Sequence, residues 1–222
     1  MNPNDFQIPA RWSFQGADES VALFTNAEGD GLSINHFAMP PDIAADISDA
    51  TALRSFYRTA AEAGGVAMLE VDPTRISGLP AVRTILKARL EPGGFGFIGS
   101  LTLPFEDRSY VIKVQSLEGS PTGMRETAVM VMQPGAFAGD ERTGKLIGWE
   151  QDPYDAAYQG AFMRNAADDE KYDATFPDHP LSKVRGYLKE LAGTMGVSAE
   201  IRAGKPFVFP RKKPGLWARL WR

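Results

Sequence analysis

In the stretch AVRTILKARLE, residues 81–91, small or apolar side chains at the even-numbered positions 82–90 alternate with mostly cationic side chains at the odd-numbered positions 83–89. A two-residue repeat points successive side chains to opposite faces of a β-strand. The stretch is therefore predicted to be a strand with one small or apolar face and one largely cationic face. Two further β-rich runs follow, SLTLPF (100–105) and SYVIKVQSLE (109–118). Three such runs in close succession restrict the chain to folds built on an antiparallel sheet.

The N-terminal quarter predicts more strands and a helix. RWSFQG, SVALFTN and GLSINHFAM are β-rich runs, and the glycines and acids of NAEGDG supply turn chemistry between the last two, which predicts a hairpin. After Asp49, apolar residues are spaced three and four apart. This spacing predicts a helix that Asp49 caps and Gly64 ends.

A second helix is predicted in SPTGMRETAVMVM. Ser120 would be its N-cap, and Pro121 would occupy the first helical position, where the missing N–H costs nothing. Up to about residue 133 the predicted order is two strands, a helix, three strands and a helix. This order favours the α+β class, with a twisted antiparallel sheet flanked by helices in an α/β/α sandwich-like arrangement.

The C-terminal part is predicted to add helices. QDPYDAAYQGAFMRNA would begin at an Asp152 cap. DHPLSKVRGYLKELAGTMG would bury one stripe of side chains, namely Leu181, Val184, Leu188, Leu191 and Met195. The chain is accordingly divided into an α+β core (1–133), a helical extension that packs on the core (134–204) and a basic tail (205–222).

Two glycine patterns resemble nucleotide-binding loops. Gly94, Gly96 and Gly99 have the spacing of a dinucleotide-binding fingerprint, but SLTLPF follows where that fingerprint requires a helix. In GDERTGKL (139–146), Leu146 stands where a P-loop requires Ser or Thr. Both patterns are therefore predicted to be turns, the first of them a hairpin connection, and no cofactor is expected.

Composition narrows the class of protein. The absence of cysteine excludes a disulfide framework, and the N-terminal MNPNDFQIPARW lacks the basic and apolar regions of a signal peptide. A cytoplasmic location is therefore expected. Residues 1–204 carry 18 basic and 28 acidic side chains, whereas residues 205–222 carry six basic ones and no acid. An acidic body with a basic tail is not typical of a nucleic-acid-binding protein.

Cations on the predicted sheet form the first candidate binding site. Arg83, Lys87 and Arg89 share one strand face, and Lys113 lies on a strand that is expected nearby. Several long cationic side chains on one face would meet an acidic protein partner. The alternative is that this face is simply solvated, as one face of an antiparallel sheet often is.

The tail RKKPGLWARLWR is the second candidate. Arg211, Lys212 and Lys213 precede a Pro-Gly break, and Trp217 and Trp221 fall on one side of a short predicted helix. Basic residues combined with tryptophans fit a groove on a partner protein or a membrane surface. The alternative is that the tryptophans are buried against the chain's own domain or against a second copy in a homo-oligomer.

The histidines provide the enzymatic alternative. His36 and His179 have no spacing typical of a metal or catalytic motif, so no metal site is assigned. His179 follows the acidic run DDEKYDATFPD (168–178), which either binds a divalent cation weakly or is a solvated loop before a helix. This segment is where an unrecognised hydrolase site would be expected.

The segment ISGLPAVRTILKARLE, which leads into SYVIKVQSLEG, and the predicted element order together resemble the Mog1/PsbP-like superfamily over about residues 10–133. The resemblance implies a twisted antiparallel sheet flanked by helices and, for most members, a binding, assembly or adaptor role without catalysis. The function expected from the sequence is therefore that of a non-catalytic binding or adaptor protein, with a hydrolase as the alternative.

Overall fold

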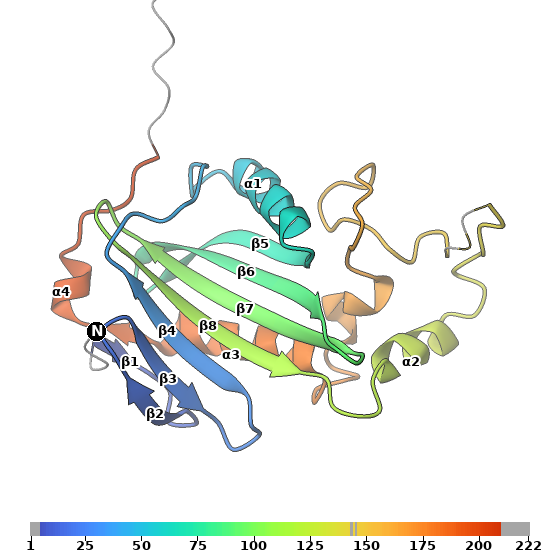
Figure 1. The fold of residues 1–222 in the computed structure, drawn as a ribbon, viewed down its shortest axis with the longest axis horizontal. Helices are drawn as coiled ribbons and strands as arrows, with labels where there is room; N and C mark the ends of the chain where they lie inside the picture. Colours follow the sequence, from blue (N-terminus) through green and yellow to red (C-terminus); the bar gives the residue numbers. More distant parts are fainter. Residues whose placement is uncertain (1–4, 143, 145, 210–222) are drawn as a thin grey trace, which may run out of the picture.

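The structure, a computed structural model, describes residues 5–142, 144 and 146–209 of the 222-residue chain. Its centre is a seven-stranded antiparallel sheet in the order β2-β3-β4-β8-β7-β6-β5 (Figure 1). With its helices this sheet makes an α+β fold, as predicted. The strands are β2 (Ser13–Ala17), β3 (Val21–Thr25), β4 (Gly31–Phe37), β5 (Ala67–Ile76), β6 (Leu79–Arg89), β7 (Phe95–Pro104) and β8 (Ser109–Leu117).

Helices lie on both sides of the sheet but cover it unequally. In Figure 1, α3 runs behind the sheet and packs on β7 and β8, whereas α1 lies in front, near the β5 edge. The helices are α1 (Ala50–Ala63), α2 (Met124–Met132), α3 (Pro180–Thr194) and α4 (Ala199–Arg202), with 3-10 turns η2 (Ala166–Asp168) and η3 (Glu170–Tyr172). A separate two-stranded sheet pairs β1 (Phe6–Gln7) with β9 (Gly196–Val197).

The larger core lies between the sheet and α3. The stripe predicted for α3 is buried there in full, from Leu181 to Met195. Gly99 of β7 allows α3 to approach closely, since a Cβ at this position would lie 2.6 Å from Val184 Cγ1 and 2.7 Å from Leu188 Cδ1. One glycine of the dinucleotide-like pattern therefore serves helix–sheet packing.

Neither glycine pattern lies before a helix, as a nucleotide-binding loop would. Gly94 has a positive φ of 86° in the turn between β6 and β7, which confirms the predicted hairpin, while Gly96 and Gly99 lie within β7 itself. In GDERTGKL, Gly139 pairs with Leu146 across an isolated β-bridge. The chain therefore reverses direction between Gly139 and Leu146, as expected for a turn.

The front core is smaller. Asp49 caps α1 by accepting hydrogen bonds from the backbone N–H groups of Thr51 and Ala52, both at 3.0 Å, which confirms the predicted start of this helix. Leu53 of α1 packs with Val71 of β5 and Val82 of β6. Because α1 stays near the β5 edge, no helix of the described residues lies over the front faces of β3, β4 and β8 (Figure 1).

One strand of the seven-stranded sheet was missed by the sequence prediction. β5 contains Pro73 at its centre, and a proline cannot donate a hydrogen bond to a neighbouring strand. The strand is nevertheless formed because it lies at the edge of the sheet, where only one side of the backbone must pair.

The predicted helix over residues 152–165 is wrong. The Asp152 carboxylate does accept hydrogen bonds from the N–H groups of Tyr154 and Asp155, as an N-cap would, but it also binds the guanidinium of Arg58 on α1 through two bonds of 2.8 Å. The Tyr154 hydroxyl accepts a hydrogen bond from the N–H of Val71 on β5. These contacts hold the segment as an irregular loop along α1 and β5.

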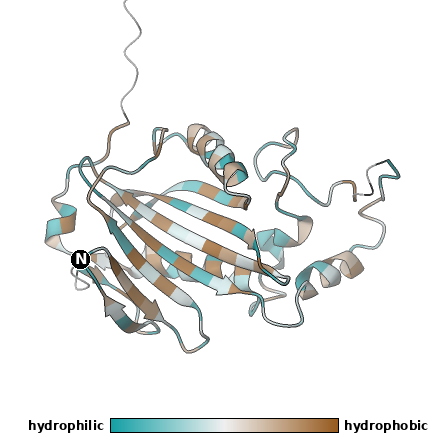
Figure 2. Cartoon of the chain, in the orientation of Figure 1, coloured by the Kyte–Doolittle hydropathy of each residue, from teal (hydrophilic) through white to brown (hydrophobic). Residues whose placement is uncertain are grey.

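The α2 helix begins three residues later than the predicted first helical position, after Gly123 at φ 73°, so Ser120 is not its N-cap. Figure 2 shows the apolar and polar residues of the strands alternating and hydrophobic residues along α2. Of the α2 side chains, Met124 and Val131 are exposed, whereas Val129 is buried. Within the described part of the chain, no helix has the length and apolar character needed to cross a membrane.

Candidate functional site

Lys87 lies on the rear face of the sheet and is completely buried, so the prediction of an exposed lysine at this position is wrong. Its ammonium Nζ lies 3.0 Å from Oδ1 of Asp168 and 3.2 Å from Oε1 of Glu126. It also lies 4.0 Å from the centre of the Phe95 ring. Two acids that are distant in sequence neutralise the charge of the lysine, which makes its burial tolerable. The buried ammonium is therefore not accessible to a binding partner.

Arg83 shares that rear face and is likewise neutralised within the chain. It forms an ion pair with Glu70 on the neighbouring strand β5. The other oxygen of Glu70 accepts a hydrogen bond from Nε of Arg185 on α3 at 2.5 Å, and Arg185 continues to Asp173 at 2.8 Å. Arg83 is therefore the first member of an alternating chain of charges under the sheet.

Arg125 of α2 completes this charged cluster and is almost fully buried. Its guanidinium donates hydrogen bonds to the carbonyl oxygens of Ala167 (2.6 Å) and Asp169 (3.0 Å), to the Asp173 carboxylate (2.9 Å) and to the Ser182 hydroxyl (2.8 Å). A planar guanidinium can serve several acceptors at once. Arg125 thus ties α2 to the loop that precedes α3.

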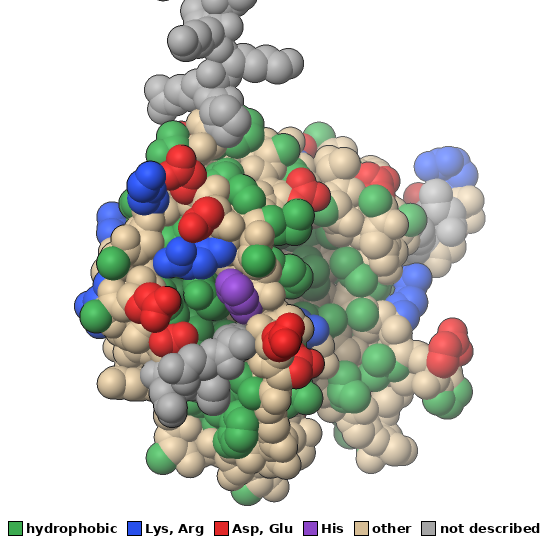
Figure 3. Space-filling model, turned by 60° about the vertical axis from the view of Figure 1, so that its left-hand side comes forward, with side chains coloured by type: hydrophobic (Ala, Val, Ile, Leu, Met, Phe, Trp, Pro, Cys, Tyr) green, Lys and Arg blue, Asp and Glu red, His purple; other side chains and the backbone are tan. Residues whose placement is uncertain are grey.

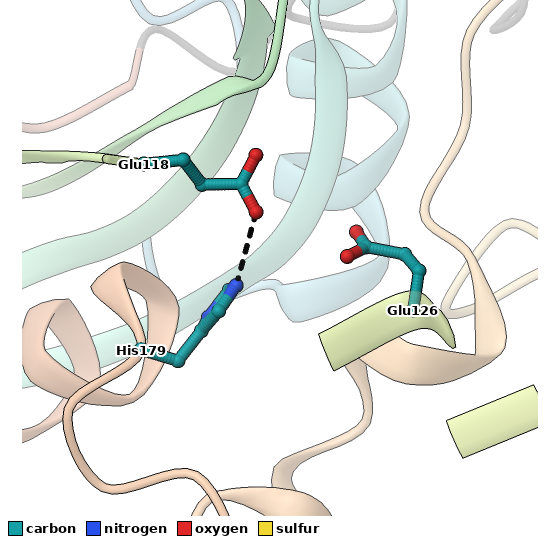
Figure 4. Close-up of side chains that lie close together, drawn as sticks. All are labelled: Glu118, Glu126 and His179. Carbon is teal, nitrogen blue, oxygen red and sulfur yellow. Dashed lines mark ion pairs between the residues drawn. The ribbon is translucent and has the colours of Figure 1, made fainter. Parts of the chain in front are cut away.

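His179, Glu118 and Glu126 lie together at the margin of this cluster (Figure 4). Glu118 follows β8, Glu126 belongs to α2, and His179 is the N-cap of α3. His179 Nε2 lies 3.4 Å from Glu118 Oε1, and one ligand atom from each of the three residues falls within 4.8 Å of the others. These three residues are the candidate ligands for a bound cation.

The arrangement does not suit a metal ion at Nε2. His179 Nδ1 accepts a hydrogen bond from the N–H of Leu181 at 3.2 Å and faces the guanidinium of Arg125 at 3.5 Å. A neutral imidazole whose Nδ1 accepts carries its proton on Nε2 and has no lone pair there for a metal. Lys87 and Arg125 add positive charge beside the site. His179 therefore caps α3 through Nδ1 and contacts Glu118 through Nε2.

The environment of Glu118 is reflected in its pKa. Burial by itself raises the pKa of this carboxyl, but the contact with the His179 ring and the hydrogen bond from the N–H of Phe95 at 2.8 Å outweigh burial, and the net pKa is lowered. Glu118 is thus held as a carboxylate that joins the end of β8 to the start of β7 and to α3.

The acidic loop 168–179 was the predicted place for a hydrolase site. Asp168 binds Lys87, Asp173 binds Arg125 and Arg185, and His179 contacts Glu118. These groups are engaged in contacts within the chain, so their arrangement favours a structural role over the activation of a substrate.

Lys113 lies on the opposite face of the sheet from Arg83 and Lys87. Across the strands, Arg83 pairs with Leu101, which pairs with Ile112, so Lys113, the next residue along, points the other way. The expectation that Lys113 extends the same cationic face is therefore wrong. Its direct neighbours are the hydroxyl residues Ser33 on β4 and Ser100 on β7.

We call the front of β3, β4 and β8, together with the adjoining residues Ile98 and Ser100 of β7, the open face. Lys113 is half-buried and is the one charged side chain that the described residues of these four strands direct to it. In Figure 3 the front of the molecule is seen obliquely, and hydrophobic side chains line a hollow there. The open face comprises Val21, Leu23, Ser33, Asn35, Ile98, Ser100, Val111, Lys113, Gln115 and Leu117.

Arg89, at the end of β6, is exposed, and its guanidinium lies over the Phe162 ring at 4.1 Å. The predicted tail residues lie outside the described residues: Arg211, Lys212, Lys213, Trp217 and Trp221.

Sequence reasoning missed the acids that neutralise Lys87, and two signals were present. Ile85 shares the strand face of Arg83 and Lys87, and a β-branched apolar residue between cations indicates a buried face. Asn165 and Asp168 are spaced three apart, and they form a capping box that fixes the Asp168 carboxylate.

Acid is expected to destabilise the fold. Hydrogen bonds from Arg58 and the backbone outweigh burial, which acts in the opposite direction, and lower the pKa of Asp152. A carboxyl whose pKa is depressed by folding contributes stability above its unfolded pKa of about 4, and that stability is lost as the pH falls through the lower folded value. The free energy of unfolding, from urea titrations at a series of pH values, should therefore fall below pH ~4.

Asp152→Asn should reduce that acid dependence and should cost about 1.5–3 kcal/mol at neutral pH, because charge-assisted hydrogen bonds to Arg58 are lost. Glu106→Gln, at a largely exposed carboxylate, is the matched control. An unchanged acid slope in Asp152→Asn would contradict the assignment to this carboxyl.

No family model matches the chain, and no curated protein matches it. Solved structures resemble it weakly. A Pseudomonas aeruginosa protein of unknown function has a TM-score of 0.36 and 13% identity, over 56% of this chain and 96% of the other. The PsbP protein of Synechocystis sp. PCC 6803 (CyanoP) has a TM-score of 0.33 and 13% identity, over 59% and 83%.

A Bacteroides thetaiotaomicron protein has a TM-score of 0.31 and 12% identity, over 52% of this chain, which spans only 39% of that protein. At these scores the likeness carries no argument about function. The predicted resemblance to PsbP-like proteins is therefore found at the level of the fold alone.

Proposed function

We propose that this protein is a non-catalytic binding or adaptor protein that meets a protein partner through its open face. The observation that carries the proposal is Lys113, a half-buried lysine on a sheet face that is not covered by any helix in residues 5–142 or 146–209. The rear-face cations Arg83 and Lys87 are matched by acids of the same chain. A cation that the fold does not need for its own core is available for recognition.

The surroundings of Lys113 indicate the chemistry of the partner. Leu23 and Leu117 on the open face are 47% and 60% exposed, so the same face that presents the lysine also presents apolar side chains. Asn35 donates a hydrogen bond to the Ser33 hydroxyl at 3.0 Å, so polar groups beside the lysine are already ordered. A single cation on a face that also presents apolar side chains fits a protein segment that carries an Asp or Glu among apolar residues.

The test is a charge reversal with a matched control. Lys113→Glu should lose a partner that the wild-type protein retains, with binding at least about tenfold weaker, since reversal places like charges together. Lys189→Glu alters an exposed lysine on α3, behind the sheet, and should leave binding unchanged. Quantitative pull-downs from the native host compare the three proteins, and titration calorimetry with the captured partner gives the affinities.

Either of two results would count against the proposal. One is a partner that binds wild-type and Lys113→Glu proteins equally, and the other is a loss of equal size in both variants. The predicted contribution of the tail is tested in the same assay with Trp217→Ala combined with Trp221→Ala in the full chain.

A further inference from the structure

Lys87, Asp168 and Glu126 converge from β6, η2 and α2 on one point behind the sheet. Lys87 Nζ lies 3.0 and 3.1 Å from the two carboxylate oxygens of Asp168 and 3.2 Å from Oε1 of Glu126. The side chains of Lys87 and Asp168 are each 1% exposed. An amine and a carboxyl group are thus held in contact, away from water, with a second carboxylate beside them.

Aromatic rings as well as carboxylates surround this pair. The Nζ atom lies 4.0 Å from the centre of the Phe95 ring and 5.6 Å from that of Phe97. Because the ammonium and the Asp168 carboxylate are in direct contact, transfer of a single proton between them converts both groups to uncharged forms. A desolvated, neutral lysine is a nucleophile, and the Asp168 carboxyl carbon is the nearest electrophile in this cluster.

We propose that Lys87 and Asp168 condense to form an intramolecular isopeptide bond, with Glu126 transferring the protons. After a proton passes from the ammonium to the Asp168 carboxylate, Nζ attacks Cγ and a C–N bond forms. Glu126 takes a proton from the nitrogen and gives it to the departing hydroxyl. The C–O bond then breaks and one water leaves, so an ammonium and a carboxylate become an amide and water, without any oxidant or co-reactant.

The contacts of the two acids suit these roles. Asp168 Oδ2 accepts a hydrogen bond from the N–H of Asn165 at 2.8 Å, which fixes the carboxyl group and stabilises negative charge on that oxygen during attack. Glu126 faces Lys87 with Oε1, while its buried Oε2 has no hydrogen-bond partner in the described part of the chain. An oxygen without a partner beside the amine is free to accept and return a proton.

The decisive measurement is the intact mass of the purified full-length protein under denaturing conditions. The expected mass is lower by one water than the mass calculated from the sequence, and proteolysis should yield one branched product that joins the peptides containing Lys87 and Asp168. A protein at the full calculated mass, with these two peptides separate, would overturn the proposal.

Two carboxylate variants separate the role of Glu126 from that of a neighbour. Glu126→Gln keeps the shape but cannot accept the proton, and it should show the full mass while circular dichroism reports a folded protein. Glu118→Gln alters the adjacent carboxylate, 5% exposed at its side chain, and should retain the cross-link. A cross-linked Glu126→Gln protein would remove Glu126 from the mechanism.

Discussion

Arg125→Met should lower the free energy of unfolding by about 3–5 kcal/mol, the cost typical of breaking a buried ion pair by removing one partner. Arg125 is 1% exposed and supplies hydrogen bonds to four groups. Methionine would fill much of the same volume but would remove the Arg125 donor from the buried carbonyl oxygen of Ala167 and leave the Asp169 carbonyl oxygen with the N–H of Tyr172. Urea unfolding of wild-type and variant proteins measures the difference.

The matched control is Arg164→Met. Arg164 pairs with Asp169 at 3.7 Å and its side chain is 24% exposed, so its removal should cost less than about 1 kcal/mol. Equal losses in the two variants would show that the buried cluster does not hold α2 against the loop before α3.

Phe97→Ala should destabilise the fold by a similar amount, about 3–5 kcal/mol, because it deletes a large side chain from the main core and leaves a cavity. Phe97 is completely buried, and its ring contacts the ring of His179 at a centroid distance of 5.3 Å. The variant therefore removes apolar packing and also loosens the start of α3. Thermal and urea unfolding, monitored by circular dichroism, give the change.

Phe37→Ala provides the comparison for Phe97→Ala. Phe37 is 46% exposed at the end of β4, and its truncation should change the free energy of unfolding by less than about 1 kcal/mol. If Phe97→Ala were as mild, the packing between the sheet and α3 would not be the main source of stability.

Local patterns predicted many of the elements. The period of two over residues 81–91, the cap at Asp49 and the apolar stripe that begins at Leu181 depend on residues close in sequence, and each of these elements is present. The wrongly predicted helix after Asp152 shows where local patterns fail. The segment after Asp152 has helical capping chemistry, but Arg58, far away in the chain, competes for the same carboxylate.

The candidate sites depended on the tertiary structure far more than the elements did. The sequence showed that Arg83 and Lys87 share a strand face, since this follows from the backbone geometry. It could not show which face receives α3, because that choice is made by Gly99 and by the apolar neighbours that close on the helix. Nor could it show that Lys113 points the other way, because the register between strands decides this.

The sequence by itself determined the α+β class, the limits of α1 within a residue or so, and the buried stripe of α3, because periodicity and caps are properties of neighbouring residues. The tertiary structure alone decided that Lys87 is buried with Asp168 and Glu126 and that Lys113 faces outward. A lysine in a strand has the same local sequence signal in both situations. Whether the lysine is buried or exposed depends on whether carboxylates from distant segments reach its ammonium group, since burial of an unpaired charge is too costly.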